Sequence, residues 1–173
     1  MERWLAAGLV AIASAGLLGC PYEAPVEPAG IPLALQGADV GIWRCTSREG
    51  GEQADLSIGR SDASTYLLSL RGTEPRSDND PDDDPPLVLY AKPRRVAGRE
   101  VWVLSEAFPT RPKKFFYLAE VERRSARERS FRLVSDDHVP ADPSTAADLS
   151  RALGKASRQE GFFDGRIPCR RRD

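Results

Sequence analysis

Short apolar runs separated by clusters of turn residues recur along most of this chain. In one of them, apolar Ala54, Leu56 and Ile58 alternate with polar Asp55 and Ser57. Such alternation puts the apolar side chains on one face of an extended strand. Comparable runs occupy residues 42–45, 54–58, 65–70, 87–92, 101–104, 115–121, 131–134 and 162–169. We therefore predict a mainly β fold, a small antiparallel barrel or sandwich of about eight strands.

One helix is predicted, late in the chain. Asp142 is a suitable N-cap, and Pro143 would occupy the first helical position. Apolar residues follow at helical spacing, at Ala146, Leu149, Leu153 and Ala156. Gly161 ends the pattern before the last strand.

The first strand begins with Gly41-Ile42-Trp43. This Gly-x-Trp, together with a late helix, resembles the arrangement in lipocalin-like barrels. The resemblance implies a closed barrel whose first strand carries Trp43. It rests on these residues and the order of elements, and a sandwich stays open as the alternative.

An uncharged apolar run covers residues 5–18 near the amino terminus. A membrane-spanning helix needs about 20 apolar residues, and this run is shorter. With Arg3 ahead of it, the run is typical of the hydrophobic region of an export signal.

The run ends in Leu17-Leu18-Gly19-Cys20, which resembles the lipobox of bacterial lipoprotein precursors. The resemblance implies a signal peptide over residues 1–19, cleavage between Gly19 and Cys20, and acylation of Cys20 with palmitate-type chains. One acyl chain binds a membrane only marginally, whereas two or three give lasting attachment. An ordinary secretory signal with a chance cysteine is the alternative.

Prolines dominate the segment that follows. Residues 20–38 contain Pro21, Pro25, Pro28 and Pro32, which favour extended backbone. We predict a tether over residues 20–38 that spans up to roughly 50 Å, and a single β-rich domain over residues 39–173. In lipoproteins an Asp after the lipidated Cys favours the inner membrane. Pro21 therefore implies the outer membrane, with the domain facing the periplasm.

The remaining cysteines, Cys45 and Cys169, lie near the two ends of the predicted domain. An even number of cysteines in an exported protein indicates a disulfide. Two buried free thiols are the alternative. The formal net charge of −1 gives no overall field that favours nucleic acid, so we expect no nucleic-acid partner.

Aromatic residues on the predicted strands are candidates for a ligand pocket. If the barrel is closed, inward aromatics could surround a small apolar ligand. Aromatics on strands are more often simply core. The pocket candidates are Trp43, Tyr66, Trp102, Phe115 and Tyr117.

Catalytic and metal-binding patterns are weak. The single histidine, His138, follows Ser135 and Asp136, but these neighbours lack a GxSxG motif and an evident oxyanion hole. We predict no catalytic residue, metal site or cofactor. A further acidic group suits a solvated loop better than a calcium site, and comprises Asp78, Asp80, Asp82, Asp83 and Asp84.

Basic clusters could meet anionic headgroups at a membrane, although a solvated surface is the simpler interpretation. They comprise Arg111, Lys113 and Lys114, the run 123–129, and residues 170–172.

The sequence therefore predicts a non-enzymatic, lipid-anchored envelope lipoprotein that binds an apolar ligand or an envelope protein. A small envelope hydrolase and a structural or assembly subunit of an outer-membrane complex are the alternatives.

Overall fold

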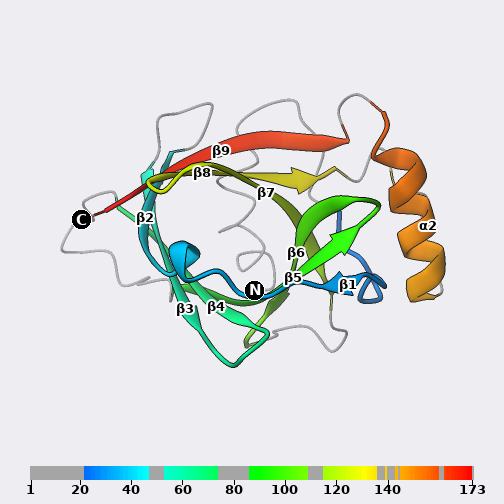
Figure 1. Ribbon diagram of the computed structural model, residues 1–173, viewed down its shortest axis with the longest axis horizontal. Helices are drawn as coiled ribbons and strands as arrows, with labels where there is room; N and C mark the ends of the chain where they lie inside the picture. Colours follow the sequence, from blue (N-terminus) through cyan, green and yellow to red (C-terminus); the bar gives the residue numbers. More distant parts are fainter. Residues whose placement is uncertain are drawn as a thin grey trace, which may run out of the picture.

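The protein is a closed antiparallel β-barrel. Figure 1 looks down the barrel from one end, so that the strands form a ring. The computed structural model describes residues 22–46, 53–73, 86–108, 115–135, 139, 143, 145–159 and 162–172. Consecutive strands pair around the ring, and the last pairs with the first. The barrel strands are β2 (Gly41–Thr46), β3 (Gln53–Arg60), β4 (Tyr66–Gly72), β5 (Leu87–Val96), β6 (Arg99–Glu106), β7 (Tyr117–Ser125), β8 (Glu128–Val134) and β9 (Phe163–Arg171). The predicted mainly β class is confirmed, and the choice between barrel and sandwich is resolved.

Turn chemistry and irregularities follow the sequence closely. Strands β5 and β6 form a hairpin around Ala97 and Gly98, with φ angles of 51° and 81°. Both central residues need positive φ in the tight turns that join such strands. Pro93 lies within β5, where its carbonyl accepts a hydrogen bond from Leu33. Gly165, at φ 52°, lies at a register shift between β8 and β9.

Two apolar clusters hold the fold together. The first fills the inside of the barrel and includes Trp43, Tyr66 and Trp102. The second lies outside it, between the strands and helix α2 (Ala146–Ala156), and includes Val101 and Val103. Strand β6 therefore buries both faces, because even-numbered Trp102 and Leu104 point inward and the odd-numbered valines point toward α2.

Helix α2 covers one outer side of the barrel (Figure 1). Its buried face carries Leu149, Leu153 and Ala156, at the predicted spacing. The predicted cap was wrong. The N-cap is Thr145, whose hydroxyl accepts from the Asp148 amide at 3.1 Å, and Pro143 precedes the helix. A threonine followed by an acid three residues later satisfies the free amides of the first turn.

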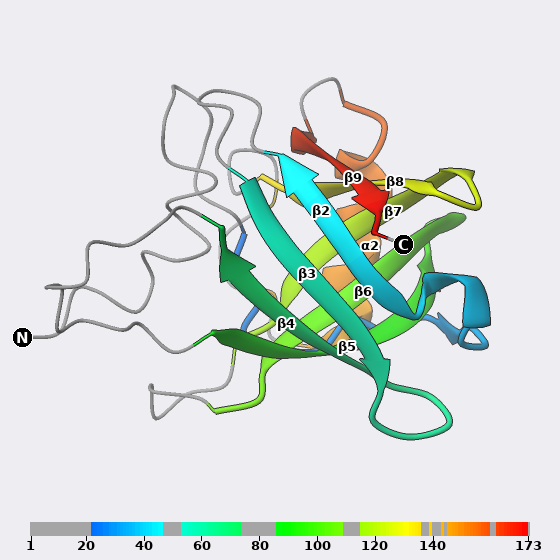
Figure 2. The same ribbon diagram turned by 90° about the vertical axis from the view of Figure 1, so that its left-hand side faces the viewer.

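The two ends of the barrel differ. At the first, which we call the plugged end, the 3-10 helix η1 (Gly37–Asp39) leads into β2 and buries Asp39. This end also holds the β5–β6 turn and the start of β4 (Figure 2). At the opposite end, strands β6 and β8 finish and strand β7 begins. We call it the entry end, because the amino-terminal segment joins the barrel there.

Residues 22–36 form a strap along the outside of the barrel, from the entry end to the plugged end. Ala24 pairs with Phe116, and β1 (Ile31–Pro32) pairs with β5. The Ser150 hydroxyl donates to the Ala29 carbonyl at 2.6 Å, which ties the strap to α2. The strap is extended, as predicted for the proline-rich tether. From residue 22 onward, however, it packs on the barrel, because its apolar side chains extend the cluster under α2.

Candidate functional site

The interior of the barrel contains four of the five predicted pocket residues. Trp43, Tyr66, Trp102 and Tyr117 are buried there, whereas Phe115 is half-buried and lies outside the interior cluster. The rings of Tyr66 and Trp102 lie 4.7 Å apart, and those of Trp102 and Phe131 lie 5.7 Å apart in an edge-to-face arrangement. The middle of the lumen is thus a packed aromatic layer.

Below this layer, the plugged end is filled by an ion-pair cluster that we call the plug. Its members are Asp39, Glu100, Arg123 and Arg129. The Asp39 carboxylate accepts from Arg123 at 2.6 and 3.0 Å and from Arg129 at 3.1 Å. Arg123 also donates to Glu100 at 2.6 Å. Two acids face two bases, so the buried group is electrically balanced.

Aromatic contacts join the plug to the lumen. The Tyr66 hydroxyl donates to Asp39 at 3.1 Å, and the Trp43 indole N–H donates to the Asp39 carbonyl at 2.9 Å. The guanidinium carbons of Arg129 and Arg171 lie 4.9 and 5.7 Å from the centre of a Trp43 ring. Such cation–π contacts stabilise a desolvated cation. Trp43, on the first barrel strand, therefore contacts the plug from inside the lumen.

The plug perturbs the proton affinity of its members. Burial alone would raise the pKa of Asp39, but the hydrogen bonds and charge of Arg123, with help from Arg129 and Tyr66, outweigh it and lower that pKa. Burial, together with the neighbouring Asp39 carboxylate, raises the pKa of Tyr66 to about 12. Asp39 is therefore ionised and Tyr66 is a neutral donor at neutral pH.

Three aliphatic side chains lie toward the entry end of the lumen. Leu70, Leu87 and Ile167 are half-buried there and pack against the interior cluster. The Tyr117 hydroxyl, also at this end, donates to Glu23 of the strap at 3.1 Å. Several connections between strands at this end lie outside the described residues. The lumen thus runs from a charged floor to an aliphatic rim.

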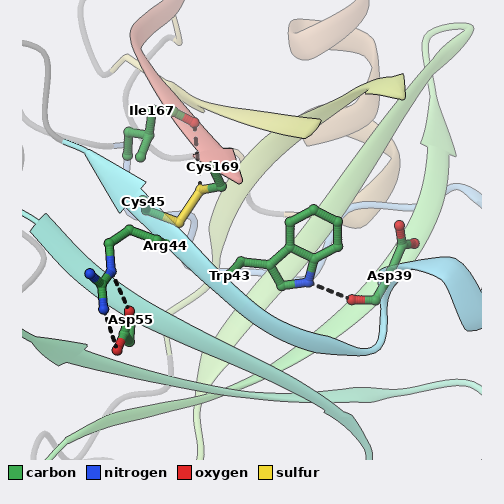
Figure 3. The surroundings of a disulfide bond; sticks show 7 residues. All are labelled: Asp39, Trp43, Arg44, Cys45, Asp55, Ile167 and Cys169. Atoms are coloured by element: carbon green, nitrogen blue, oxygen red, sulfur yellow. Dashed lines mark hydrogen bonds and ion pairs between the residues drawn. A yellow bond between two sulfur atoms is a disulfide. The ribbon is translucent and has the colours of Figure 1, made fainter. Parts of the chain in front are cut away.

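A disulfide between Cys45 and Cys169 crosses the seam where β9 meets β2 (Figure 3). The two residues are direct cross-strand partners with Cα atoms 4.0 Å apart. The predicted pairing is confirmed, and it joins the first barrel strand to the last. In the same view, Arg44 points to the outer face and pairs with Asp55 at 2.8 Å.

A surface cleft of about 1030 Å³ lies between the end of α2 and the β5–β6 turn. Basic side chains dominate its lining, and they are Arg99, Arg151, Lys155 and Arg158. Arg99 also pairs with Glu120 at 2.7 Å, and Arg151 with Asp148 at 2.9 Å. Cations in this position also oppose the negative end of the helix dipole, so the cleft by itself does not identify a ligand.

The residues of the predicted basic clusters lie in different environments. In the run 123–129, Arg123 and Arg129 point into the barrel, where a solvated surface was predicted. The error has a physical cause, because inward positions at a strand end can hold charges that pair with each other. Of the terminal group, Arg171 contacts Trp43, Arg172 pairs with Asp55 at 2.6 Å and Arg170 lies 3.6 Å from Glu128.

Several other predicted residues lie outside the described ranges. They are Cys20, the five loop aspartates, Arg111, Lys113, Lys114, Asp136 and His138. Ser135 is described and is buried beside the entry end. Within the described ranges, no three His, Cys, Asp or Glu side chains are grouped to hold a metal ion. Among those same residues, none of the helices has the length and apolarity needed to span a bilayer.

Sequence reasoning missed Asp39 and Glu100 as partners in the plug. The available signal was the two-residue period of the strands. Continued from Trp102 and Val121, it puts Glu100 and Arg123 on the inner face. Comparison with known proteins gives no family model, no curated protein and no solved structure that matches this chain.

Proposed function

We propose that this protein is a lipid-anchored envelope lipoprotein whose barrel binds a small apolar ligand at its entry end. The anchor rests on the lipobox-like Leu17-Leu18-Gly19-Cys20, with Pro21 favouring the outer membrane and a periplasmic domain. The binding role rests on the polarity of the lumen. A non-enzymatic role is part of the proposal.

The observation that supports ligand binding most directly is the contrast between the ends of the lumen. The plugged end is filled by paired charges, which leaves no apolar surface for a ligand. The entry end presents Leu70, Leu87 and Ile167, which keep part of their surface exposed. Apolar surface next to a layer of aromatic rings favours the binding of a compact hydrophobic molecule. Eight-stranded barrels are wide enough to hold one such ligand.

Replacing Leu70 by Lys should weaken binding of a neutral fluorescent probe, N-phenyl-1-naphthylamine, by about tenfold or more. Removing a leucine contact costs roughly 1.5–3 kcal/mol, and about 1.4 kcal/mol corresponds to a factor of ten. The measurement is titration of the purified protein with the probe.

The matched control is Leu67→Lys, on the same strand. Leu67 is 38 % exposed and points outward, so this variant should bind the probe as the wild type does. Circular dichroism should confirm that both variants fold. The absence of saturable binding by the wild type, or equal loss in both variants, would contradict the proposed site.

A further inference from the structure

The amino-terminal strap is fixed to the barrel from its first described residue. The Tyr22 amide donates to the Val134 carbonyl at 2.9 Å. Ala24 and Phe116 exchange two backbone hydrogen bonds, of 2.8 and 2.9 Å. Tyr22 is 7 % exposed and Ala24 is fully buried. Both residues belong to the apolar cluster that continues under α2, so the strap is part of the folded domain.

The attachment lies at the entry end. Val134 is the last residue of β8, and Phe116 directly precedes β7. The strap then runs past α2 to the plugged end, where it leads into η1 and β2. The described part of the chain therefore starts, at Tyr22, at the entry end of the barrel.

Covalent geometry then limits the position of any lipid on Cys20. One residue, Pro21, separates Cys20 from Tyr22 along the chain, so their Cα atoms lie at most about 7 Å apart. We propose that the barrel rests directly on the bilayer, with its entry end toward the lipid and its plug pointing away. This inference depends on the proposed acylation of Cys20.

An exposed aromatic side chain at the same end supports this orientation. Phe108 follows β6 and is 78 % exposed. The preceding residue, Ala107, donates to the Val88 carbonyl at 3.0 Å, which holds the chain at the rim beside β5. Transfer of such an exposed, large apolar side chain from water into the membrane interface is favourable.

The same orientation determines where the basic cleft lies. The basic cleft of Arg99, Arg151, Lys155 and Arg158 adjoins the β5–β6 turn, which belongs to the plugged end. In this orientation the cleft faces away from the anchoring membrane. The aliphatic rim of the lumen instead faces the acyl chains, so an apolar ligand would be exchanged with the bilayer itself.

Quenching of tryptophan fluorescence by brominated lipids tests the orientation. The full-length protein would be expressed with its signal, extracted with detergent and placed in phosphatidylcholine vesicles that contain lipids brominated on their acyl chains. An interfacial aromatic lies about 5–10 Å into the headgroup and acyl boundary, so Phe108→Trp should lose about half of its added emission. The wild-type protein, with buried Trp43 and Trp102, supplies the reference signal.

The matched control is Ile31→Trp on β1. Ile31 is 67 % exposed and lies toward the plugged end, opposite Arg95 of β5. We expect no quenching at this position. Equal quenching at both positions, or quenching at position 31 alone, would overturn the orientation.

A spacer variant tests the role of the strap. Fifteen Gly and Ser residues inserted between Pro21 and Tyr22 should leave the protein on vesicles but abolish the quenching of Phe108→Trp. Unchanged quenching would show that the short connection does not set the orientation. A protein whose mass shows no acyl chains would overturn the anchor itself, and with it this inference. Acylated protein without quenching at position 108 would overturn the orientation alone.

Discussion

Replacing Asp39 by Asn is expected to lower the free energy of unfolding by about 3–5 kcal/mol. The carboxylate is 1 % exposed and neutralises Arg123 and Arg129 inside the barrel. An amide keeps the shape of the side chain but removes its charge, which leaves the buried Arg129 guanidinium without its carboxylate partner and Arg123 with Glu100 alone. Urea unfolding followed by circular dichroism measures the difference, because the slope with denaturant should stay the same while the midpoint falls.

The matched control for Asp39 is Asp55→Asn. Asp55 pairs with Arg44 and Arg172 on the outer face, where water screens the charges. Exposed pairs of this kind contribute at most about 1 kcal/mol. Similar losses in the two variants would show that the plug adds no more stability than a surface ion pair.

The effect of Asp39 on stability also depends on pH. Its pKa is lowered in the folded protein, so its stabilising contribution is fully present above the unfolded-state value of about 3.9. That contribution is lost as the pH falls through the folded-state pKa. The difference in stability between wild type and Asp39→Asn should therefore shrink below about pH 4. A difference that stays constant from pH 7 to pH 3 would contradict this role for the charge.

Removal of the Cys45–Cys169 disulfide is the second large effect that we expect. The bond joins residues 124 positions apart and ties β2 to β9 at the seam of the barrel. In a chain-entropy model, closing a loop of this length stabilises the folded state by about 5 kcal/mol, at the upper end of the usual range. The double variant Cys45→Ala/Cys169→Ala should therefore unfold at a clearly lower urea concentration than the oxidised wild type.

A reductant supplies the control for the disulfide. Dithiothreitol should lower the stability of the wild type toward that of the double variant and leave the double variant unchanged. Equal stability of the oxidised wild type and the double variant would mean that the β2–β9 hydrogen bonds hold the seam without help from the covalent bond.

Local patterns predicted much of this fold. Alternation in residues 54–58 and helical spacing from Ala146 to Ala156 identified their elements, because burial on one face leaves a direct periodic signature. The pairing of Cys45 with Cys169 followed from cysteine number and export. Closure into a barrel was not decidable, since it depends on β9 pairing with β2 across nearly the whole domain.

The features that escaped prediction are long-range and charged. Asp39 pairs with Arg123 and Arg129, which lie 84 and 90 residues away in the sequence. No local sequence pattern predicts which residues pair over such separations. The run 123–129 is so rich in charged residues that we predicted a solvent-exposed surface. The strap was misjudged for a similar reason. Its prolines favour extended backbone, but they do not reveal that Ala24 and Tyr22 are buried in the apolar cluster outside the barrel.

The central claim, that this barrel is held to a membrane through Cys20, is tested most directly by the intact mass of the membrane-extracted protein. We expect a mass equal to residues 20–173 plus acyl chains, rising by two hydrogen atoms when Cys45–Cys169 is reduced. A Cys20→Ser variant should lose the acyl mass. A wild-type mass without lipid, or one that begins elsewhere in the chain, would contradict the anchor and make this protein a free exported barrel.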